Sequence, residues 1–306
     1  MPKLSVIIPT HKRAEILKRC LHCLEEQTVA SDLEVIVVSD GKDDNTRVLF
    51  ANSSFRIPVK FFEIEKSQQG TARNEGLRHA QGETVLFIGD DIFLAPDACE
   101  KHLNTHEHSK NQKTNSNICV LGFTTWDPSV GITPVMTWLE KSGWQFGYHA
   151  LNRLAPRSLG EVGSRATGPE PFIPSSVQHR YTYTSHISLP LSVAKKHLFR
   201  TDVHLYGWED IEWGMRLKNA GVRVLYEPAA KALHHHRIML EESLKRMETL
   251  GRSAVEIRKK VPEFDRVPTG MKLLLYGIAA LLPTITGKHR KYFLRGIDQN
   301  PVPLGG

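Results

Sequence analysis

Two adjacent carboxylates, Asp90 and Asp91, follow an apolar run at 84–88 that predicts a buried strand. Neighbouring carboxylates repel each other in one cavity unless a cation lies between them. Mg²⁺ and Mn²⁺ bind carboxylate and diphosphate oxygens together, so a divalent metal would stabilise both this pair and an anionic ligand. The alternative is a turn in which one of the two aspartates caps the next helix. Both interpretations stay open on these residues alone.

A second acidic pair, Glu209 and Asp210, stands at the start of a predicted helix over 209–221. Acidic side chains in a first helical turn also complement the helix dipole, which is the structural alternative. The chemical interpretation is a general base, because one carboxylate near a hydroxyl can remove its proton as the hydroxyl attacks. One member of the pair would suffice for that role.

Three consecutive histidines follow a predicted strand over 223–233. Alternate side chains of an extended segment share a face, so we expect His234 and His236 to point into one crevice while His235 points away. This arrangement favours contact with a metal or a phosphate over a purely structural role. Which histidine would contact the ion stays open.

Arg73 lies in the first turn of a predicted helix over 71–80, directly after Gln68-Gln69-Gly70. Helix N-terminal amides and a guanidinium group can bind a diphosphate together. A solvated arginine is an equally acceptable interpretation of the same residues.

The elements that position these residues alternate between strand and helix. Runs of β-branched residues predict strands, and apolar positions at three- and four-residue spacing predict helices. This alternation is typical of a doubly wound, mostly parallel α/β sheet with helices on both faces, whose ligands bind at the carboxyl ends of the strands. The predicted strands are 4–8, 33–38, 59–64 and 84–88, the predicted helices include 14–27 and 71–80, and the polar residues at strand ends are Thr10, His11, Ser39, Asp40, Asp90 and Asp91.

The middle of the chain is less regular. Residues 104–117 are polar and predict an exposed loop, whereas 122–180 is rich in Gly, Pro and aromatic residues and predicts irregular structure facing a ligand. Trp126 and Asp127 are the candidates for ligand contact there. Further helices are predicted at 192–197 and 239–260.

The C-terminal region, 237–306, is predicted to be helical. Its apolar run at 270–283 is shorter than the roughly 20 residues that span a bilayer. Because the basic residues Lys288–Lys291 follow, segment 270–291 predicts a helix lying on an anionic membrane. A buried helix that covers the domain or a partner subunit is the alternative.

The composition is that of a folded protein with a basic surface. The chain has 306 residues, 40% of them hydrophobic, and a net charge of +7, which suits a nucleotide diphosphate, a membrane or nucleic acid. Nucleic acid is disfavoured because the basic residues are dispersed and no stacking motif accompanies them. Four cysteines and the lack of a signal-peptide core predict a cytoplasmic protein, and the Cys20-x-x-Cys23 pair has no second pair to complete a zinc site.

Taken in order, these segments resemble the family 2 glycosyltransferases. The resemblance is dense over 4–100 and clear over 181–236. It implies a GT-A fold in residues 1–236, with a nucleotide-sugar-binding half at 1–100 and an acceptor-binding, catalytic half at 101–236. The matching segments are SVIIPTHKR, LEEQT, EVIVVSDG, QGTARNEGL, AQGETVLFIGDD, SLPLSVAKK, GWEDIEWGMRLKNAG and YEPAAKALHHH.

The resemblance implies roles for individual residues. Asp210 matches the catalytic base, with Glu209 beside it, and Asp91 matches the last aspartate of the metal-binding Asp-x-Asp motif. Two positions depart from the family pattern: Ser39 stands where Asp is usual, and Gly89 replaces the first Asp of Asp-x-Asp. The predicted donor site comprises Pro9, Thr10, His11, Arg13, Asp40, Arg73 and Asp90; the metal ligands are Asp91, His234 and His236; the acceptor residues are Trp126, Asp127 and Trp208.

The sequence therefore predicts an inverting, Mn²⁺- or Mg²⁺-dependent transfer of a sugar, from UDP by family frequency, to a glycan or lipid-linked acceptor. The predicted location is cytoplasmic, with the C-terminal region as a candidate for peripheral attachment to the inner face of the cell membrane. A catalytically silent nucleotide-sugar or glycan-binding protein is the alternative. A nucleotidyltransferase fits less well, because Pro9-Thr-His-Lys-Arg13 occupies the place of its Gly-rich triphosphate loop.

Overall fold

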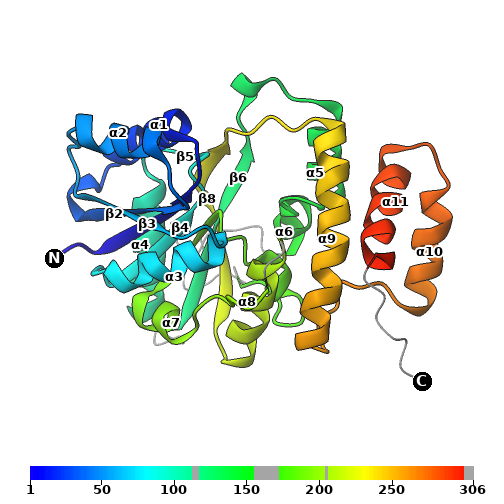
Figure 1. Ribbon diagram of the computed structural model, residues 1–306. Helices are drawn as coiled ribbons and strands as arrows, with labels where there is room; N and C mark the ends of the chain where they lie inside the picture. Colours follow the sequence, from blue (N-terminus) through cyan, green and yellow to red (C-terminus); the bar gives the residue numbers. More distant parts are fainter. Residues whose placement is uncertain (112–116, 155–171, 204–205, 300–306) are drawn as a thin grey trace.

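A computed structural model describes residues 1–111, 117–154, 172–203 and 206–299. Within these ranges the centre is one eight-stranded sheet with the order β3-β2-β1-β4-β7-β6-β8-β5 (Figure 1). β1 to β4 are parallel, β7 is antiparallel to both β4 and β6, β8 is parallel to β6, and β5 is antiparallel to β8. The strands are β1 Leu4–Thr10, β2 Leu33–Asp40, β3 Val59–Ile64, β4 Thr84–Ile88, β5 Ile92–Leu94, β6 Ile118–Trp126, β7 His186–Pro190 and β8 Arg223–His234.

The parallel half of the sheet is buried on both faces, which is why its strands appear as continuous apolar runs. Along β1, Val6 and Ile8 enter one apolar core and Ile7 enters the other. The predictions for strands and helices in this half are confirmed to within a few residues. The helices are α1 Ala14–Glu25, α2 Asp44–Asn52 and α3 Gln69–His79.

The prediction of an exposed loop at 104–117 is wrong over its described part, because α4 (Ala98–Asn111) continues through it. Residues 112–116 lie outside the described residues. The buried face of α4 is polar: His106 Nε2 lies 2.8 Å from Ser188 Oγ of β7. Because the buried side chains of α4 are mostly polar and hydrogen-bonded inside the protein, the sequence lacks the apolar spacing that predicts a helix.

The region 122–180 is more regular than predicted. β6 extends into it, and α5 (Pro134–Ser142) and α6 (Tyr148–Leu154) follow. Thr133 caps α5 by accepting from Met136 N at 3.3 Å, and Pro134 occupies the first helical position, which are local start signals. The part of this prediction that concerns 155–171 lies outside the described residues.

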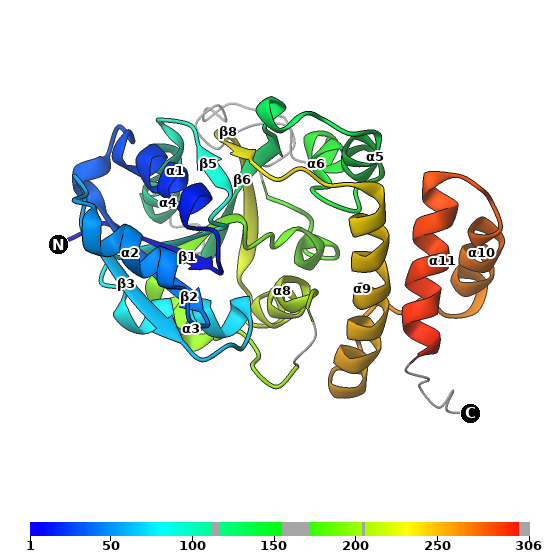
Figure 2. The ribbon, with the colours of Figure 1, turned by 45° about the horizontal axis from the view of Figure 1, so that its top comes forward.

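Three helices follow the sheet. α9 (Leu240–Lys260) lies between the sheet and the hairpin of α10 (Gly270–Ala280) and α11 (Ile285–Asp298), as Figures 1 and 2 both show. α9 also shares an apolar core with α8 (Glu209–Asn219), since Ile211 packs with residues of α9 and α11. This core contains residues from both sides of residue 236, the predicted domain boundary. The boundary itself stays a prediction.

Among the α-helices of the described residues, α10 is the one without a buried residue. Its large apolar side chains are exposed, and Leu274, Leu275 and Ile278 each exceed 50% exposure. Among the described residues, no helix is both long enough and apolar enough to cross a membrane.

Candidate active site

A cleft of about 970 Å³ opens where the strands of the parallel half end and α8 begins. All of the predicted site residues line it except Trp126 and Asp127. The cleft therefore brings together side chains from β1, β2, the turn after β4, α3, α8 and the end of β8. The predicted residues on its walls are Pro9, Thr10, His11, Arg13, Asp40, Arg73, Asp90, Asp91, Trp208, Glu209, Asp210, His234 and His236.

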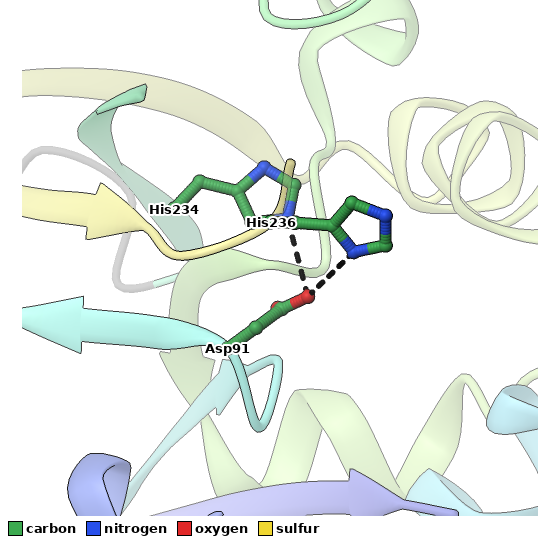
Figure 3. A group of neighbouring side chains, drawn as sticks. All are labelled: Asp91, His234 and His236. Atoms are coloured by element: carbon green, nitrogen blue, oxygen red, sulfur yellow. Dashed lines mark hydrogen bonds and ion pairs between the residues drawn. The ribbon is translucent and has the colours of Figure 1, made fainter. Parts of the chain in front are cut away.

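Asp91, His234 and His236 form the one group of potential metal ligands found among the described residues (Figure 3). Asp91 Oδ2 lies 3.3 Å from His234 Nε2 and 3.4 Å from His236 Nδ1. His235 points away and lies 2.6 Å, Nδ1 to Oδ2, from Asp127. The three rings alternate as expected, since His234 and His236 face Asp91 and His235 faces Asp127.

Arg13 links both aspartates. Its Nη1 lies 2.9 Å from Asp90 Oδ1, and its Nη2 lies 2.8 Å from Asp91 Oδ2. Burial and the charge of Asp91 raise the pKa of Asp90 to about 6. Burial opposes ionisation of Asp91 too, but hydrogen bonds with His234 and His236 hold its pKa well below the ordinary value. Asp91 is thus the carboxylate that stays charged and can accept a cation.

The residues present fit a divalent metal. One carboxylate and two imidazoles, with ligand atoms within 4.8 Å of one another, form a mixed oxygen and nitrogen set that suits Mn²⁺ and related ions. Gly89 explains the departure from Asp-x-Asp, since an added Cβ would lie 2.8 Å from Asp91 Oδ1. The Asp91 carboxylate occupies the space that the side chain of an aspartate at position 89, the first position of Asp-x-Asp, would need.

Ser39 and Asp40 have separate tasks at the end of β2. Ser39 is fully buried and its hydroxyl donates to Gly41 O at 2.7 Å, so it closes the turn after the strand. Asp40 faces the cleft and accepts from Lys66 Nζ and from Ser67 N, both at 2.7 Å. Lys66 is a cleft residue that the sequence analysis missed.

Arg73 is 3% exposed and lies on the cleft wall. Its Nη2 donates to Gln69 Oε1 at 3.2 Å, whereas Nε and Nη1 have no hydrogen-bond partner among the described residues. Glu209 Oε1 lies 3.9 Å from Nη1. A buried guanidinium with unused donors is costly unless an anion completes it, so Arg73 is suited to an anionic ligand.

Asp210 lies in the first turn of α8 and faces the cleft. Its Oδ1 accepts from Ile211 N at 2.8 Å. Burial, followed by the charge of Glu209, raises the pKa of Asp210 to about 6. A carboxylate with this pKa is ionised at neutral pH and still basic enough to accept a proton.

The backbone before Asp210 is strained, and hydrogen bonds from α9 hold it in place. Gly207 has φ +102° and Trp208 has φ +68°, a conformation that non-glycine residues rarely adopt. α9 holds both residues: Ser253 Oγ donates to Gly207 O at 3.0 Å, and Trp208 Nε1 donates to Leu250 O at 2.8 Å. The C-terminal helices therefore fix the turn that presents Asp210.

Trp126 and Asp127 are placed differently from the prediction, because both lie behind the histidines and off the cleft wall. The Trp126 ring stacks on His234 with centroids 5.1 Å apart, and Asp127 holds His235. These contacts orient the histidine segment. The structure gives neither residue a contact surface for an acceptor, since they are only 4% and 6% exposed.

Cations on the C-terminal side of the cleft escaped the sequence analysis. Arg180, Arg266 and Lys272 line it; Arg266 and Lys272 lie at the start of the α10 segment, whereas Arg180 is more than 80 residues earlier in the chain. These three cations do not form a motif with a fixed short spacing in the sequence. Only the fold assembles it.

Residues 5–118 match the model of glycosyl transferase family 2. Validoxylamine A glucosyltransferase of Streptomyces hygroscopicus subsp. jinggangensis is 26% identical over 242 residues, which are 72% of this chain and 53% of that protein. A GalNAc(5)-diNAcBac-PP-undecaprenol beta-1,3-glucosyltransferase of Campylobacter jejuni is 37% identical over 101 residues, 32% of each chain. The matches thus span about half or less of these relatives' lengths.

Two solved structures share the fold. The mannosyltransferase PcManGT from Pyrobaculum calidifontis, in complex with GDP-Man and Mn²⁺, superposes with a TM-score of 0.56 at 19% identity, covering 98% of this chain and 76% of that one. Residues 1–349 of Staphylococcus aureus TarS with UDP-GlcNAc give 0.51 at 17% identity, covering 83% and 66%. The curled, mostly parallel sheet and its helices have the GT-A fold of these structures. The match of residues 5–118 to the glycosyl transferase family 2 model agrees with the sequence resemblance.

Proposed function

We propose that the protein transfers a sugar from a nucleoside diphosphate to a hydroxyl of a glycan or lipid-linked acceptor, with inversion at the anomeric carbon. The observation that carries this proposal is the convergence of Asp91, His234 and His236 with Asp210 in one cleft. A metal-ligand group and a buried carboxylate with raised pKa are the two components that such a displacement needs.

Asp210 removes the proton of the acceptor hydroxyl as that oxygen attacks the anomeric carbon, and the bond to the diphosphate breaks. Arg73 donates to the leaving diphosphate with its unused Nε and Nη1 groups. Asp91, His234 and His236 would hold the ion, with Arg13 beside them. When bound, Mn²⁺ or Mg²⁺ would supply positive charge that stabilises the diphosphate as it departs.

The donor we propose is a UDP-sugar. It would lie along Pro9, Thr10 and His11, with Asp40 near the base. A solved protein of the same fold holds UDP-GlcNAc, which supports uridine, whereas another holds GDP-Man. Trp208 stays our candidate for acceptor contact, because it lines the cleft beside Asp210.

We also propose a cytoplasmic location with peripheral attachment to an anionic membrane through α10 and α11. The exposed apolar side chains of α10 would enter the membrane interface, and the exposed Lys288 and Lys291 of α11 would meet anionic headgroups. The protein should therefore sediment with anionic vesicles, and Leu274→Glu should weaken this. Absence of sedimentation would contradict the attachment.

The experiment that tests the function is thermal stabilisation by nucleoside diphosphates and their sugars, with and without Mn²⁺, followed by donor hydrolysis. A ligand bound only by the native state raises its stability with concentration. A Mn²⁺-dependent shift with one nucleotide, together with slow hydrolysis of its sugar, is the expected result. Stabilisation without hydrolysis would favour a silent nucleotide-sugar-binding protein, and no shift would contradict the donor site.

A further inference from the structure

The C-terminal wall of the cleft carries an excess of positive charge. Arg180 comes from a short 3₁₀ helix (Gln178–Tyr181), Arg266 precedes α10, and Lys272 lies in its first turn. Asp265 is the acidic residue within this cationic cluster, which we define as Arg180, Arg266 and Lys272. Its Oδ2 accepts from Arg180 Nη2 at 2.5 Å, and its Oδ1 lies 3.5 Å from Arg266 Nε.

One carboxylate is not enough for three cations. Arg266 Nε is buried and makes no hydrogen bond among the described residues. Burial lowers the pKa of Arg266, and partial burial of the ammonium group lowers that of Lys272; Asp265 opposes both shifts, but neighbouring cations add to them. Cations that repel one another on the wall of a cleft are stabilised by an anion, and a phosphate group with several acceptor oxygens is the anion that suits them.

Aromatic residues hold this wall in place. The Arg290 guanidinium lies 3.6 Å from the ring centroid of Tyr276 and 4.3 Å from that of Trp144. Both rings line the cleft, so they also offer apolar surface beside the cluster. A ligand here would meet positive charge and aromatic faces together.

The cluster lies near the proposed catalytic base, Asp210. The Arg266 guanidinium is 5.7 Å from the ring centroid of Trp208, and Asp265, Arg180 and Asp210 are among the charges that act on it. No ion pair joins Arg266 or Lys272 to Asp90 or Asp91 in the described part of the chain. An anion on the cluster would therefore lie near Asp210 and Trp208, with no direct contact between the cluster and the metal-ligand group.

The same helix joins this cluster to an apolar surface. Lys272 and Tyr276 of α10 line the cleft, while Leu274, Leu275 and Ile278 are exposed on it. A ligand with a phosphate at the cluster could continue along these apolar side chains. Among phosphate-bearing acceptors, this combination favours one with a long hydrocarbon chain.

We infer that Arg180, Arg266 and Lys272 hold the diphosphate of an isoprenoid-diphosphate-linked sugar, whose hydroxyl faces Asp210 and whose hydrocarbon chain leaves along α10. This inference rests on the proposed function, because an acceptor presupposes a transfer. It places the phosphate of the acceptor and the diphosphate of the donor on opposite walls of the cleft.

The test is calorimetric binding of farnesyl diphosphate to the full chain in EDTA, so that metal does not load the donor site. Farnesol and inorganic diphosphate are the comparison probes. Farnesol has the isoprenoid chain without the diphosphate, and inorganic diphosphate has the phosphate groups without the chain. We expect farnesyl diphosphate to bind at least about tenfold more tightly than either one. Lys272→Gln and Arg266→Gln should each weaken its binding by about tenfold, whereas Lys259→Gln, at an exposed position of α9 outside the cleft, should not.

Lys272 is exposed, so its variant is expected to fold even if Arg266→Gln does not. Equal binding by wild type and Lys272→Gln, or a larger loss in Arg13→Gln, would overturn the inference. Inorganic diphosphate binding as tightly as farnesyl diphosphate would overturn the isoprenoid assignment and favour a phosphate polymer or free phosphate. Failure of the proposed function would give a different result, namely no Mn²⁺-dependent thermal stabilisation of the protein by nucleotides.

Discussion

The sheet and the C-terminal helices build opposite walls of one cleft, and their charges are balanced in different ways. On the sheet wall, Arg13 and two histidines surround Asp91, and Lys66 pairs with Asp40. On the helical wall, Arg180 and Arg266 both pair with Asp265, and Lys272 lies close enough to feel its charge. The sheet wall thus has carboxylates ready to receive a cation, whereas the helical wall has donors ready to receive an anion.

This contrast separates two tasks. Strand ends fix the sheet wall, where small changes in position would disturb metal and diphosphate together. The helical wall depends on α9, α10 and α11, whose packing on the catalytic turn is the link between the two. We expect variants on the sheet wall to change the chemistry and variants on the helical wall to change the acceptor.

Asp210→Asn should have the largest effect. The amide keeps the size of the side chain but accepts no proton, so turnover should fall by about 10²–10⁴ while donor and metal binding persist. Glu209→Gln is the matched control and should cost much less. The measurement is turnover beside Mn²⁺-dependent nucleotide stabilisation, and full activity of Asp210→Asn would remove Asp210 from the mechanism.

His236→Ala should weaken metal binding at least about tenfold, because outer contacts of metal ligands already cost 10–100-fold when removed. His235→Ala is the neighbouring comparison and should cost less, because its ring faces away from Asp91 and affects the ligands only by orienting the segment through Asp127. The Mn²⁺ concentration that gives half-maximal stabilisation with a nucleoside diphosphate measures the difference. Equal losses in the two variants would argue against the metal-ligand group.

The two walls also differ in how visible they are in the sequence. Strand alternation, the polar residues at strand ends and the alternate histidines all follow from local spacing, so the sheet wall was predicted almost residue by residue. Arg180, Arg266 and Lys272 come together only through packing of the later helices, so no local pattern reveals them. α4 was missed for a related reason, because its buried face is polar.

Gly207→Ala tests the link between the walls. The substitution is strained at φ +102°, and the added Cβ would collide with Leu250 of α9. Gly221→Ala is the matched control, since Gly221 has φ +78° but no atom within 4 Å of an added Cβ. We expect Gly207→Ala to lose about 1–3 kcal/mol more free energy of unfolding in urea, from overpacking alone. Similar losses would mean that α9 does not constrain the turn.

The pH dependence should show how the charge of Glu209 in α8 and the charge of Arg266 on the helical wall act on Asp210. Below its pKa of about 6, Asp210 becomes protonated, so kcat/KM should fall about tenfold per pH unit on the acid side. The negative charge of Glu209 raises the pKa of Asp210 and the positive charge of Arg266 lowers it. Glu209→Gln should therefore move the acid limb to lower pH, and Arg266→Gln should move it to higher pH. Shifts in the same direction would show that the helical wall does not reach the base through its charge, and would leave Arg266 a role in holding the acceptor alone.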